Sequence, residues 1–319
     1  MALEDFEKQD IIKSLVTTVE NKYVLTENIP KITSTLLSLH SGTALRKINS
    51  SEELATLLTE ELATFDKHFA VQFISNRNEQ TQPIRKESWF QRLKRSSSGF
   101  NKIEILKGNV GYIDFWGFDT LSAKSRGIVD NAMQFVSNTD ALIIDLRSNG
   151  GGSAEMVQFI SSYFLPKRTH LNSFYSRQTE HTSDYWTFDK VERIFSEDVP
   201  IYILISAKTF SAAEEFAYNF KHIRRATIIG EPSKGGANPW QWFDIGYGFR
   251  VAVPISMAIN PITKANWEGV GVIPNVQVAS KEAFEEAYIR ALGELTKKAN
   301  NNFQLDEINE KLVELTSNK

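Results

Sequence analysis

Short continuous apolar runs that alternate with helical patterns, from residue 109 onward, constrain the fold of this chain more than any other feature. The clearest runs cover 110–115, 141–144, 201–205 and 226–229, and helical patterns over 128–136, 156–164 and 212–220 separate most of them. A strand that is apolar on both faces is buried on both, as in parallel sheets whose crossover helices cover each side. The alternation therefore predicts an α/β domain built on a largely parallel central sheet.

The end of the chain continues this pattern with one more strand and two helices. The strand is expected over 249–255, and the amphipathic helices are expected near 281–298 and 304–316. We assign all of residues 109–319 to the α/β domain.

The first 65 residues follow a helical period instead. Ile12, Leu15 and Val19 lie on one helical face, and a third helix opens with a capping box at 50–53, in which a serine and a glutamate three residues later cap each other. Three short helices with apolar stripes predict a small N-terminal bundle. At 69–73 the period changes to two, which indicates a half-buried strand. We place this helical domain at 1–75.

Residues 76–108 form the predicted linker or surface segment between the two domains. The stretch 76–102 is polar, basic and rich in serine, which is typical of a solvated loop. Trp89, Phe90 and Leu93 leave open a short helix that docks on the body of the protein.

Composition bounds the partners and the chemistry. The chain has 319 residues, 41% apolar and 24% charged, with a net charge of −3, which gives no electrostatic reason to expect nucleic acid or a membrane surface. No apolar run approaches the roughly 18 residues of a membrane span. The polar N-terminus shows no signal peptide, so the compartment stays open between the cytoplasm and export with a leader outside this sequence. Because there is no cysteine, disulfides, thiolate zinc sites and a cysteine nucleophile are excluded.

A glycine-rich loop, DLRSNGGG at 145–152, follows a buried strand and precedes a helix. Glycines let the backbone approach a ligand closely, and free N–H groups at a helix start can hold an anion. The GK[ST] ending of a P-loop is missing, and GxGxxG does not fit. A tight turn would explain the glycines but would give no reason for Asp145, Arg147 and Asn149.

Ser211 begins a helix just past a strand, and two interpretations compete for it. Ser211 and Glu214 fit a capping box, and locally this interpretation is favoured because capping serines are common. Alternatively, Ser211 is a nucleophile beside the exposed N–H of Ala212.

A nucleophilic serine needs a base, and His68 stands out among five histidines because it lies at the break between the third helix and the first strand. Taken alone, His68 is better explained as a surface histidine in a turn. Lys208 and Lys234 are alternative bases, although each is also readily explained as a solvated lysine. Glu268, in the stretch WEGVGVIPN, could orient a histidine or could be a surface glutamate in a turn.

Four aromatic side chains in the last third of the chain are either partly core or the lining of an apolar pocket. They are Trp240, Trp242, Phe243 and Trp267.

Five ordered motifs together resemble the tail-specific, or C-terminal processing, family of serine peptidases. They are DKH at 66–68, DLRSNGGG at 145–152, TFSAAE at 209–214, GEPSKGGA at 230–237 and WEGVGVIP at 267–274. The resemblance is strongest to the branch that includes the interphotoreceptor retinoid-binding protein modules and the tricorn protease core. It runs from about residue 10 to 280. It implies a crotonase- or ClpP-like α/β domain behind an N-terminal helical bundle.

The resemblance also implies a role for each matched position. Ser211 falls on the nucleophile, and the N–H groups of Gly151 or Gly152 and of Ala212 fall on the oxyanion hole. His68 falls on the general base and Glu268 on the residue that orients it.

Two departures from the family pattern concern the loop at 230–238. Gly236 stands where the family's serine–lysine members have their lysine, so a serine–lysine mechanism is not supported. Asn238 stands where the retinoid-binding type often has histidine, which points to a changed pocket rather than a changed triad. Only about 35 residues separate the first strand from Val110, too few for an inserted PDZ domain.

The sequence therefore predicts a serine-type peptidase that acts on a peptide or protein substrate and needs no metal or organic cofactor. One alternative is a binding module for an apolar ligand, such as a fatty acid or a retinoid-like molecule, on the same fold. A second is an inactive peptide-binding protein.

Overall fold

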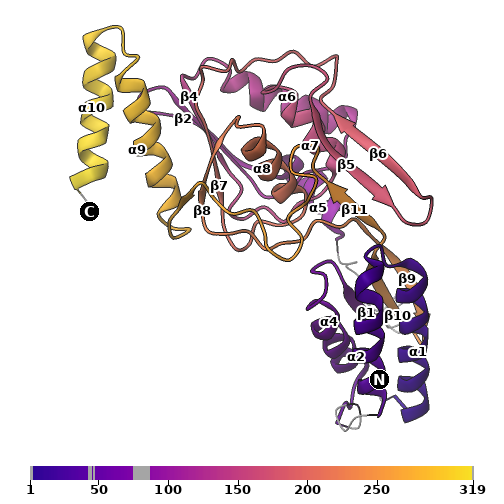
Figure 1. The fold of residues 1–319 in the computed structure, drawn as a ribbon. Helices are drawn as coiled ribbons and strands as arrows, with labels where there is room; N and C mark the ends of the chain where they lie inside the picture. Colours follow the sequence, from indigo (N-terminus) through magenta and orange to yellow (C-terminus); the bar gives the residue numbers. More distant parts are fainter. Residues whose placement is uncertain (1–2, 42–44, 46, 75–86, 318–319) are drawn as a thin grey trace. The chain divides into compact units, whose positions relative to one another are not determined.

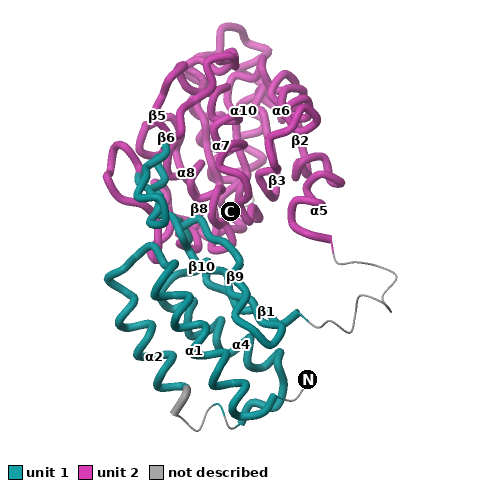
Figure 2. The backbone as a smooth tube through the Cα atoms, turned by 90° about the vertical axis from the view of Figure 1, so that its right-hand side faces the viewer, with its two compact units in different colours: residues 1–86, 173–183, 236–259 teal, residues 87–172, 184–235, 260–319 magenta. Residues whose placement is uncertain are grey.

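The computed structural model describes residues 3–41, 45, 47–74 and 87–317, and these residues form two compact units (Figure 2). Unit 1 comprises 1–86, 173–183 and 236–259, and unit 2 comprises 87–172, 184–235 and 260–319. Each unit is described by itself below. No helix among the described residues is both long and apolar enough to cross a membrane.

Unit 1 contains the predicted helices and a small antiparallel sheet (Figure 1). The helices are α1 (Asp5–Lys22), α2 (Ile29–Ser41) and α4 (Ser51–Leu62). The strands are β1 (Ala70–Phe73), β9 (Trp240–Gly246) and β10 (Phe249–Pro254), in the order β1-β10-β9. The core joins the helix stripes to the sheet, for example through the fully buried Ile12, Leu58 and Phe249.

The pairing of β1 with β10 places residues 236–259 in unit 1, whereas the sequence analysis assigned them to the α/β domain. An isolated strand of four residues cannot bury its apolar face or satisfy its backbone, so β1 needs partners. It finds them about 180 residues further along the chain, in register Ala70↔Ala252 to Phe73↔Phe249.

Unit 2 is built on a sheet with the strand order β12-β8-β7-β4-β3-β2. Its strands are β2 (Phe100–Leu106), β3 (Val110–Phe115), β4 (Ala141–Asp145), β7 (Ile201–Ile205), β8 (Thr227–Gly230) and β12 (Val276–Gln277). Only β2 pairs antiparallel, and the other neighbours are parallel. The predicted mixed α/β fold with a largely parallel sheet is confirmed.

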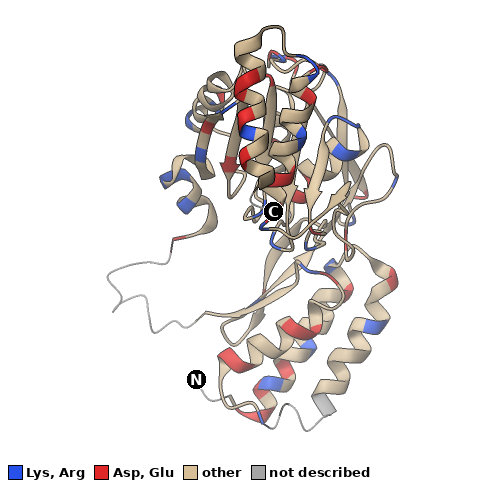
Figure 3. Ribbon diagram, turned by 90° about the vertical axis from the view of Figure 1, so that its left-hand side faces the viewer, with Lys and Arg blue, Asp and Glu red and all other residues tan. Residues whose placement is uncertain are grey.

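Helices cover both faces of this sheet, as the apolar runs predicted (Figure 1). On one side lie α6 (Ala123–Phe135), α7 (Ala154–Ser161) and α8 (Ala212–His222), and on the other α9 (Ala283–Thr296) and α10 (Asn302–Ser317). Ala287 and Leu292 of α9 pack against the β-sheet side chains Val110 and Ile143. Acidic and basic residues alternate along the outer surface of α9 and α10 (Figure 3). They include the pairs Arg290–Glu286 and Lys311–Glu314.

A third sheet joins β11 (Ser256–Ile259), β5 (His170–Ser176) and β6 (His181–Trp186) in antiparallel order. The boundaries between the two units fall within β5 and β6 and directly after β11.

The part of the linker that is described contains the short helix that the sequence left open. This helix, α5 (Trp89–Arg95), begins with a capping box between Ser88 and Gln91. Leu93 is fully buried, and the Trp89 ring meets the Trp116 ring edge-on at 5.1 Å. The rest of the polar stretch, 76–86, lies outside the described residues.

Candidate active site

Ser211 lies on a strained turn between β7 and α8. Its backbone has φ 57° and ψ −122°, whereas an ordinary N-cap residue has an extended backbone with negative φ. A non-glycine residue in this region costs on the order of 1–3 kcal/mol, and such outliers cluster at functional sites. A serine on a sharp strand-to-helix turn is also the geometry that exposes the nucleophile of α/β hydrolases. The helix start alone does not require this backbone.

The turn is tied to the end of the neighbouring strand, β4. The Thr209 hydroxyl donates to the carbonyl of Leu146 at 2.8 Å, and the Phe210 N–H donates to the carbonyl of Asn149 at 3.0 Å. Because β4 and β7 are adjacent and parallel, their carboxyl ends bring the glycine-rich loop and the Ser211 turn together.

Glu214 holds the other side of the turn. Its carboxylate is fully buried and accepts the Ser211 N–H at 2.8 Å, the Ser233 hydroxyl at 2.6 Å and the Gly235 N–H at 2.6 Å. Ser233 in turn accepts the N–H of Val272 at 2.6 Å. Glu214 therefore forms its predicted capping contact with Ser211 and also fastens two loops to the turn.

The glycine-rich loop touches the Ser211 turn directly. A Cβ added at Gly151 would lie 2.7 Å from the Cβ of Ser211 and 2.9 Å from the nitrogen of Ala212. The Gly151 N–H donates to Oδ1 of Asn149 at 2.9 Å, so it already has an acceptor. Within the described part of the chain, the N–H groups of Gly152 and Ala212 donate to no acceptor.

The polar residues of this loop have structural partners. Arg147 Nε donates to Oδ1 of Asp145 at 2.9 Å, and the Tyr112 hydroxyl donates to Oδ2 of the same carboxylate at 2.8 Å. The Asn149 amide donates to the carbonyl of Phe115 at 2.8 Å. These contacts explain the pattern that a simple glycine turn left without a reason.

His68 lies in unit 1, between α4 and β1, with its side chain only 4% exposed. The backbone N–H of His68 donates to Oδ1 of Asp66 at 2.9 Å, and the imidazole Nδ1 lies 3.9 Å from the same oxygen. Asn238 donates from Nδ2 to the other carboxylate oxygen of Asp66 at 2.8 Å. In the sequence Asp66 stands out only as part of the DKH motif, and no signal marked it as a carboxylate partner of His68.

The remaining members of the predicted triad belong to unit 2. Glu268 is partly buried, and its N–H donates to Oδ1 of Asn266 at 2.9 Å. Its loop is joined to the loop after β8 by a hydrogen bond from the Gly269 N–H to the Gly235 carbonyl at 3.1 Å. Since Ser211 and Glu268 lie in unit 2 and His68 lies in unit 1, a triad that joins them stays a prediction.

The five residues predicted to line a pocket are not brought together in either unit. Trp240 and Trp242 lie on one face of β9, their rings 5.2 Å apart, whereas Phe243 faces the helical core. Asn238 is fully buried against Asp66. Trp267 is a core residue of unit 2, 1% exposed and 5.3 Å from the ring of Tyr218.

The two lysines considered as alternative bases, Lys208 and Lys234, have different surroundings. The Lys234 ammonium lies 4.5 Å from the centre of the Phe210 ring, in cation–π geometry. Lys208 lines a cavity of about 500 Å³ at the carboxyl ends of β3, β4 and β7, together with Asp114 and Asp145. Burial raises the pKa of Asp114 above its ordinary value, a shift that its hydrogen bond with Asn101 opposes.

Helix α8 carries a second buried acid, one turn after Ser211. Glu215 is 2% exposed, and burial raises its pKa to about 8, a shift that the Asn172 amide opposes. Glu215 is therefore mostly protonated at neutral pH. No motif pointed to it, because its burial depends on the packing of α8.

The sequence of unit 2 matches a known family over most of its sheet. Residues 109–278 match peptidase family S41, and this segment is more than half of the chain. The chain belongs to peptidase family S41. Residues 6–101 match the N-terminal domain of family S41 peptidases in eukaryotic IRBP, as the resemblance to the retinoid-binding modules implied.

Two curated relatives of this S41 chain are processing proteases. A carboxy-terminal-processing protease of Bartonella bacilliformis is 27% identical over 178 residues, which are 54% of this chain and 39% of that protein. The chloroplastic carboxyl-terminal-processing peptidase 2 of Arabidopsis thaliana is 27% identical over 168 residues, 52% of this chain and 31% of that protein. The chain thus spans less than half the length of these relatives.

Solved structures share the fold. A crystal structure from Parabacteroides merdae, described as a candidate peptidase, has a TM-score of 0.63 at 18% identity and covers 92% of this chain and 98% of that one. The photosystem II D1 C-terminal processing protease has a TM-score of 0.53 at 16% identity, and the match covers 86% of this chain and 94% of that one. The expected family and fold are confirmed by these matches.

Proposed function

We propose that this chain is a serine peptidase that hydrolyses peptide bonds with Ser211 as nucleophile, His68 as general base and Glu268 as the residue that orients the imidazole. The observation that carries the proposal is the strained backbone of Ser211 directly against the glycine-rich loop. Membership in family S41 and the processing-protease relatives support the reaction class.

In the proposed mechanism, His68 takes the proton of the Ser211 hydroxyl as its oxygen attacks the carbonyl carbon of the substrate. The resulting oxyanion accepts hydrogen bonds from the Ala212 and Gly152 N–H groups. We favour Gly152 over Gly151 because the Gly151 N–H already donates to Asn149. The protonated imidazole then gives its proton to the leaving amine, and water releases the acyl group.

Asp66 adds a second carboxylate to the surroundings of the base. It is 1% exposed, holds the His68 backbone and lies 3.9 Å from the imidazole nitrogen. A negative charge at this distance favours the imidazolium that forms when Ser211 loses its proton. We assign Asp66 as a positioning residue, and Asn238 as the donor that holds it.

The proposed substrate is a polypeptide, in line with the names of the relatives. Within unit 1, Trp240 and Trp242 lie on one face of β9 and Phe243 lies on the other, so this strand alone does not favour the apolar-ligand alternative.

Labelling with a fluorophosphonate probe, which phosphonylates activated serines, tests the proposal. We expect wild-type protein to be labelled, and Ser211→Ala and His68→Ala to lose labelling. Ser137→Ala is the matched control, because Ser137 lies in the turn after α6, where its hydroxyl donates to the Gln134 carbonyl at 2.8 Å. Folded wild-type protein that stays unlabelled and cleaves no peptide, or labelling that persists in Ser211→Ala, would overturn the assignment.

A further inference from the structure

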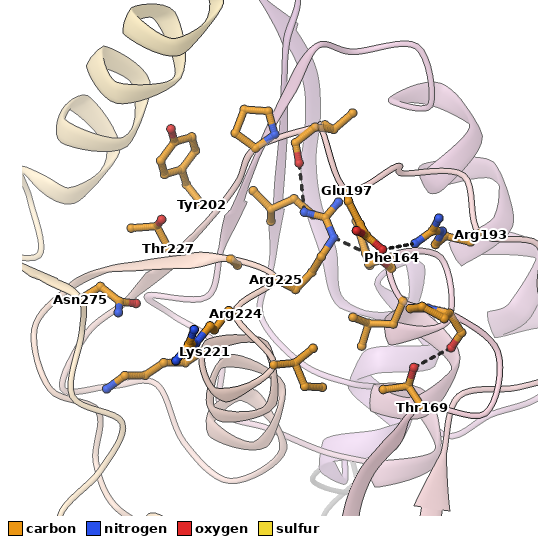
Figure 4. Close-up of a pocket in the computed structure, with 17 residues that line it drawn as sticks. Phe164, Thr169, Arg193, Glu197, Tyr202, Lys221, Arg224, Arg225, Thr227 and Asn275 are labelled. Carbon is orange, nitrogen blue, oxygen red and sulfur yellow. Dashed lines mark hydrogen bonds and ion pairs between the residues drawn. The ribbon is translucent and has the colours of Figure 1, made fainter. Parts of the chain in front are cut away.

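Unit 2 contains a large cavity at the amino ends of strands β7 and β8 (Figure 4). The cavity has a volume of about 730 Å³ and lies at the first residues of β7 and β8, Ile201 and Thr227, beside the end of α8. Ser211 follows the carboxyl end of β7, so the two features lie at opposite ends of the same strands. None of the predicted site residues lines this cavity.

Positive charge dominates the lining of this cavity, which we call the basic pocket. Four of its side chains are cationic, Arg193, Lys221, Arg224 and Arg225, and Glu197 is the one carboxylate among the residues that line it. Glu197 pairs with Arg193 at 3.3 Å. This excess of cations stands out because the whole chain has a net charge of −3.

The guanidinium of Arg225 is held in place by hydrogen bonds, but none of its acceptors is a carboxylate. Its guanidinium donates to three backbone carbonyls, those of Phe164, Ser196 and Val199, at 2.8–3.2 Å. Burial, and then the charge of Arg193, lower the pKa of Arg225 to about 10, although the charge of Glu197 opposes this shift. A bound anion would offset this unfavourable burial of positive charge.

Arg224 supplies donors that are available to a ligand. Its side chain is exposed, and within the described chain its guanidinium makes no hydrogen bond or ion pair. Across the pocket, Thr227 and Asn275 add polar groups (Figure 4). The guanidinium fork matches the oxygens of a phosphate, for which arginine is the preferred side chain.

The floor of the basic pocket is apolar. Val199, Pro200 and Ile223 line it and are partly exposed, so a ligand can contact them. The volume is far larger than one phosphate needs and lies in the range of sites for small organic ligands. We propose that the basic pocket binds a small organic phosphate, with its phosphate toward Arg224 and Arg225 and its apolar part on this floor.

Calorimetric titration of the full chain tests this proposal with inorganic phosphate, pyrophosphate and phenyl phosphate as probes. We expect saturable binding, with phenyl phosphate tighter than inorganic phosphate because it also uses the apolar floor. Arg224→Gln should weaken the binding of pyrophosphate about tenfold or more, the effect of losing a charged hydrogen bond. Lys264→Gln, an exposed site with the same change in charge, should leave the affinity unchanged.

Four results would overturn the proposal. Wild-type protein that shows no saturation up to about 10 mM of any probe would exclude the site. Equal affinity in wild type and Arg224→Gln, or equal loss in the Lys264→Gln control, would place the binding elsewhere or reduce it to general electrostatics. Phenyl phosphate that binds no tighter than inorganic phosphate would exclude the organic part of the ligand. The outcome does not depend on whether Ser211 is catalytic.

Discussion

Replacing Asp66 with asparagine separates the charge of this residue from its size. The Asp66 side chain is completely buried, the His68 side chain is 4% exposed, and Oδ1 lies 3.9 Å from Nδ1. At about 4 Å, two unit charges interact by about 1 kcal/mol in bulk water and about 4 kcal/mol at the effective dielectric constant of about 20 that suits proteins. Since about 1.4 kcal/mol corresponds to one pKa unit, Asp66→Asn should lower the pKa of His68 by about 1–3 units.

The assay is a pH titration of the histidine ring signals by NMR, with His68 assigned from the His68→Ala spectrum. The labelling rate with the fluorophosphonate probe should fall in parallel at neutral pH, because a weaker base removes the serine proton less readily. Asp306→Asn, an exposed change on α10 with the same loss of charge, should change neither quantity.

Asn238→Ala distinguishes charge from structure. It removes the amide that donates to Asp66 at 2.8 Å but keeps the carboxylate. It should therefore lower the free energy of unfolding by about 1–3 kcal/mol, the cost of an unsatisfied buried acceptor, and shift the pKa of His68 far less than Asp66→Asn does.

An unchanged His68 pKa in Asp66→Asn would refute the electrostatic reasoning, even if the variant were less stable. Unlabelled wild-type protein would instead count against the nucleophile while leaving the pKa comparison valid.

Three further changes test the architecture around Ser211. Gly151→Ala should abolish probe labelling, because its Cβ would lie 2.7 Å from the Cβ of Ser211 at a φ of +90°, whereas Gly127→Ala on α6, with no atom within 4 Å, should keep it. Glu214→Gln should lower the thermal midpoint and the labelling rate together, because one buried carboxylate accepts three hydrogen bonds; a stable but unlabelled variant would contradict the structural part of this prediction. Glu215 has an ordinary pKa of 4.5 and a folded pKa of about 8, so the unfolded chain loses this proton first as the pH rises. The wild type should thus lose up to about 1.4 kcal/mol of stability per pH unit between about pH 5 and 8 relative to Glu215→Gln, as urea unfolding would measure; parallel pH curves would refute it.

The sheet of unit 2 was predictable because each of its central strands is apolar on both faces, and its helices follow a period of 3.6. The meeting of the glycine-rich loop with the Ser211 turn follows from the same feature, since both leave the carboxyl ends of parallel strands. The pairing of β1 with β10 was not predictable, because a period of two marks a strand without naming its partner.

The hydrogen-bond partners of individual side chains in the candidate site could not be predicted either. The sequence assigned the oxyanion hole to Gly151 or Gly152 and could not decide between them, because the decision depends on where the Asn149 amide points. Likewise, Asn238 was placed at a pocket because the retinoid-binding type often has histidine there, and in the structure its buried amide donates to a carboxylate. Trp267 is a core residue, which is one of the two interpretations that the sequence left open. Motifs mark candidate positions in the sequence, whereas the partners of individual polar groups follow from packing.

The capping contact of Ser211 is compatible with its proposed role as nucleophile. A residue held at φ 57° costs on the order of 1–3 kcal/mol, and such strain persists only when the surroundings over-determine it. Glu214 provides this restraint, since it fixes the Ser211 N–H at the helix start and anchors the following loops through Ser233 and Gly235. The capping contact therefore supports the strained turn that aims the Ser211 side chain, and the Ala212 N–H beside it remains available for an oxyanion.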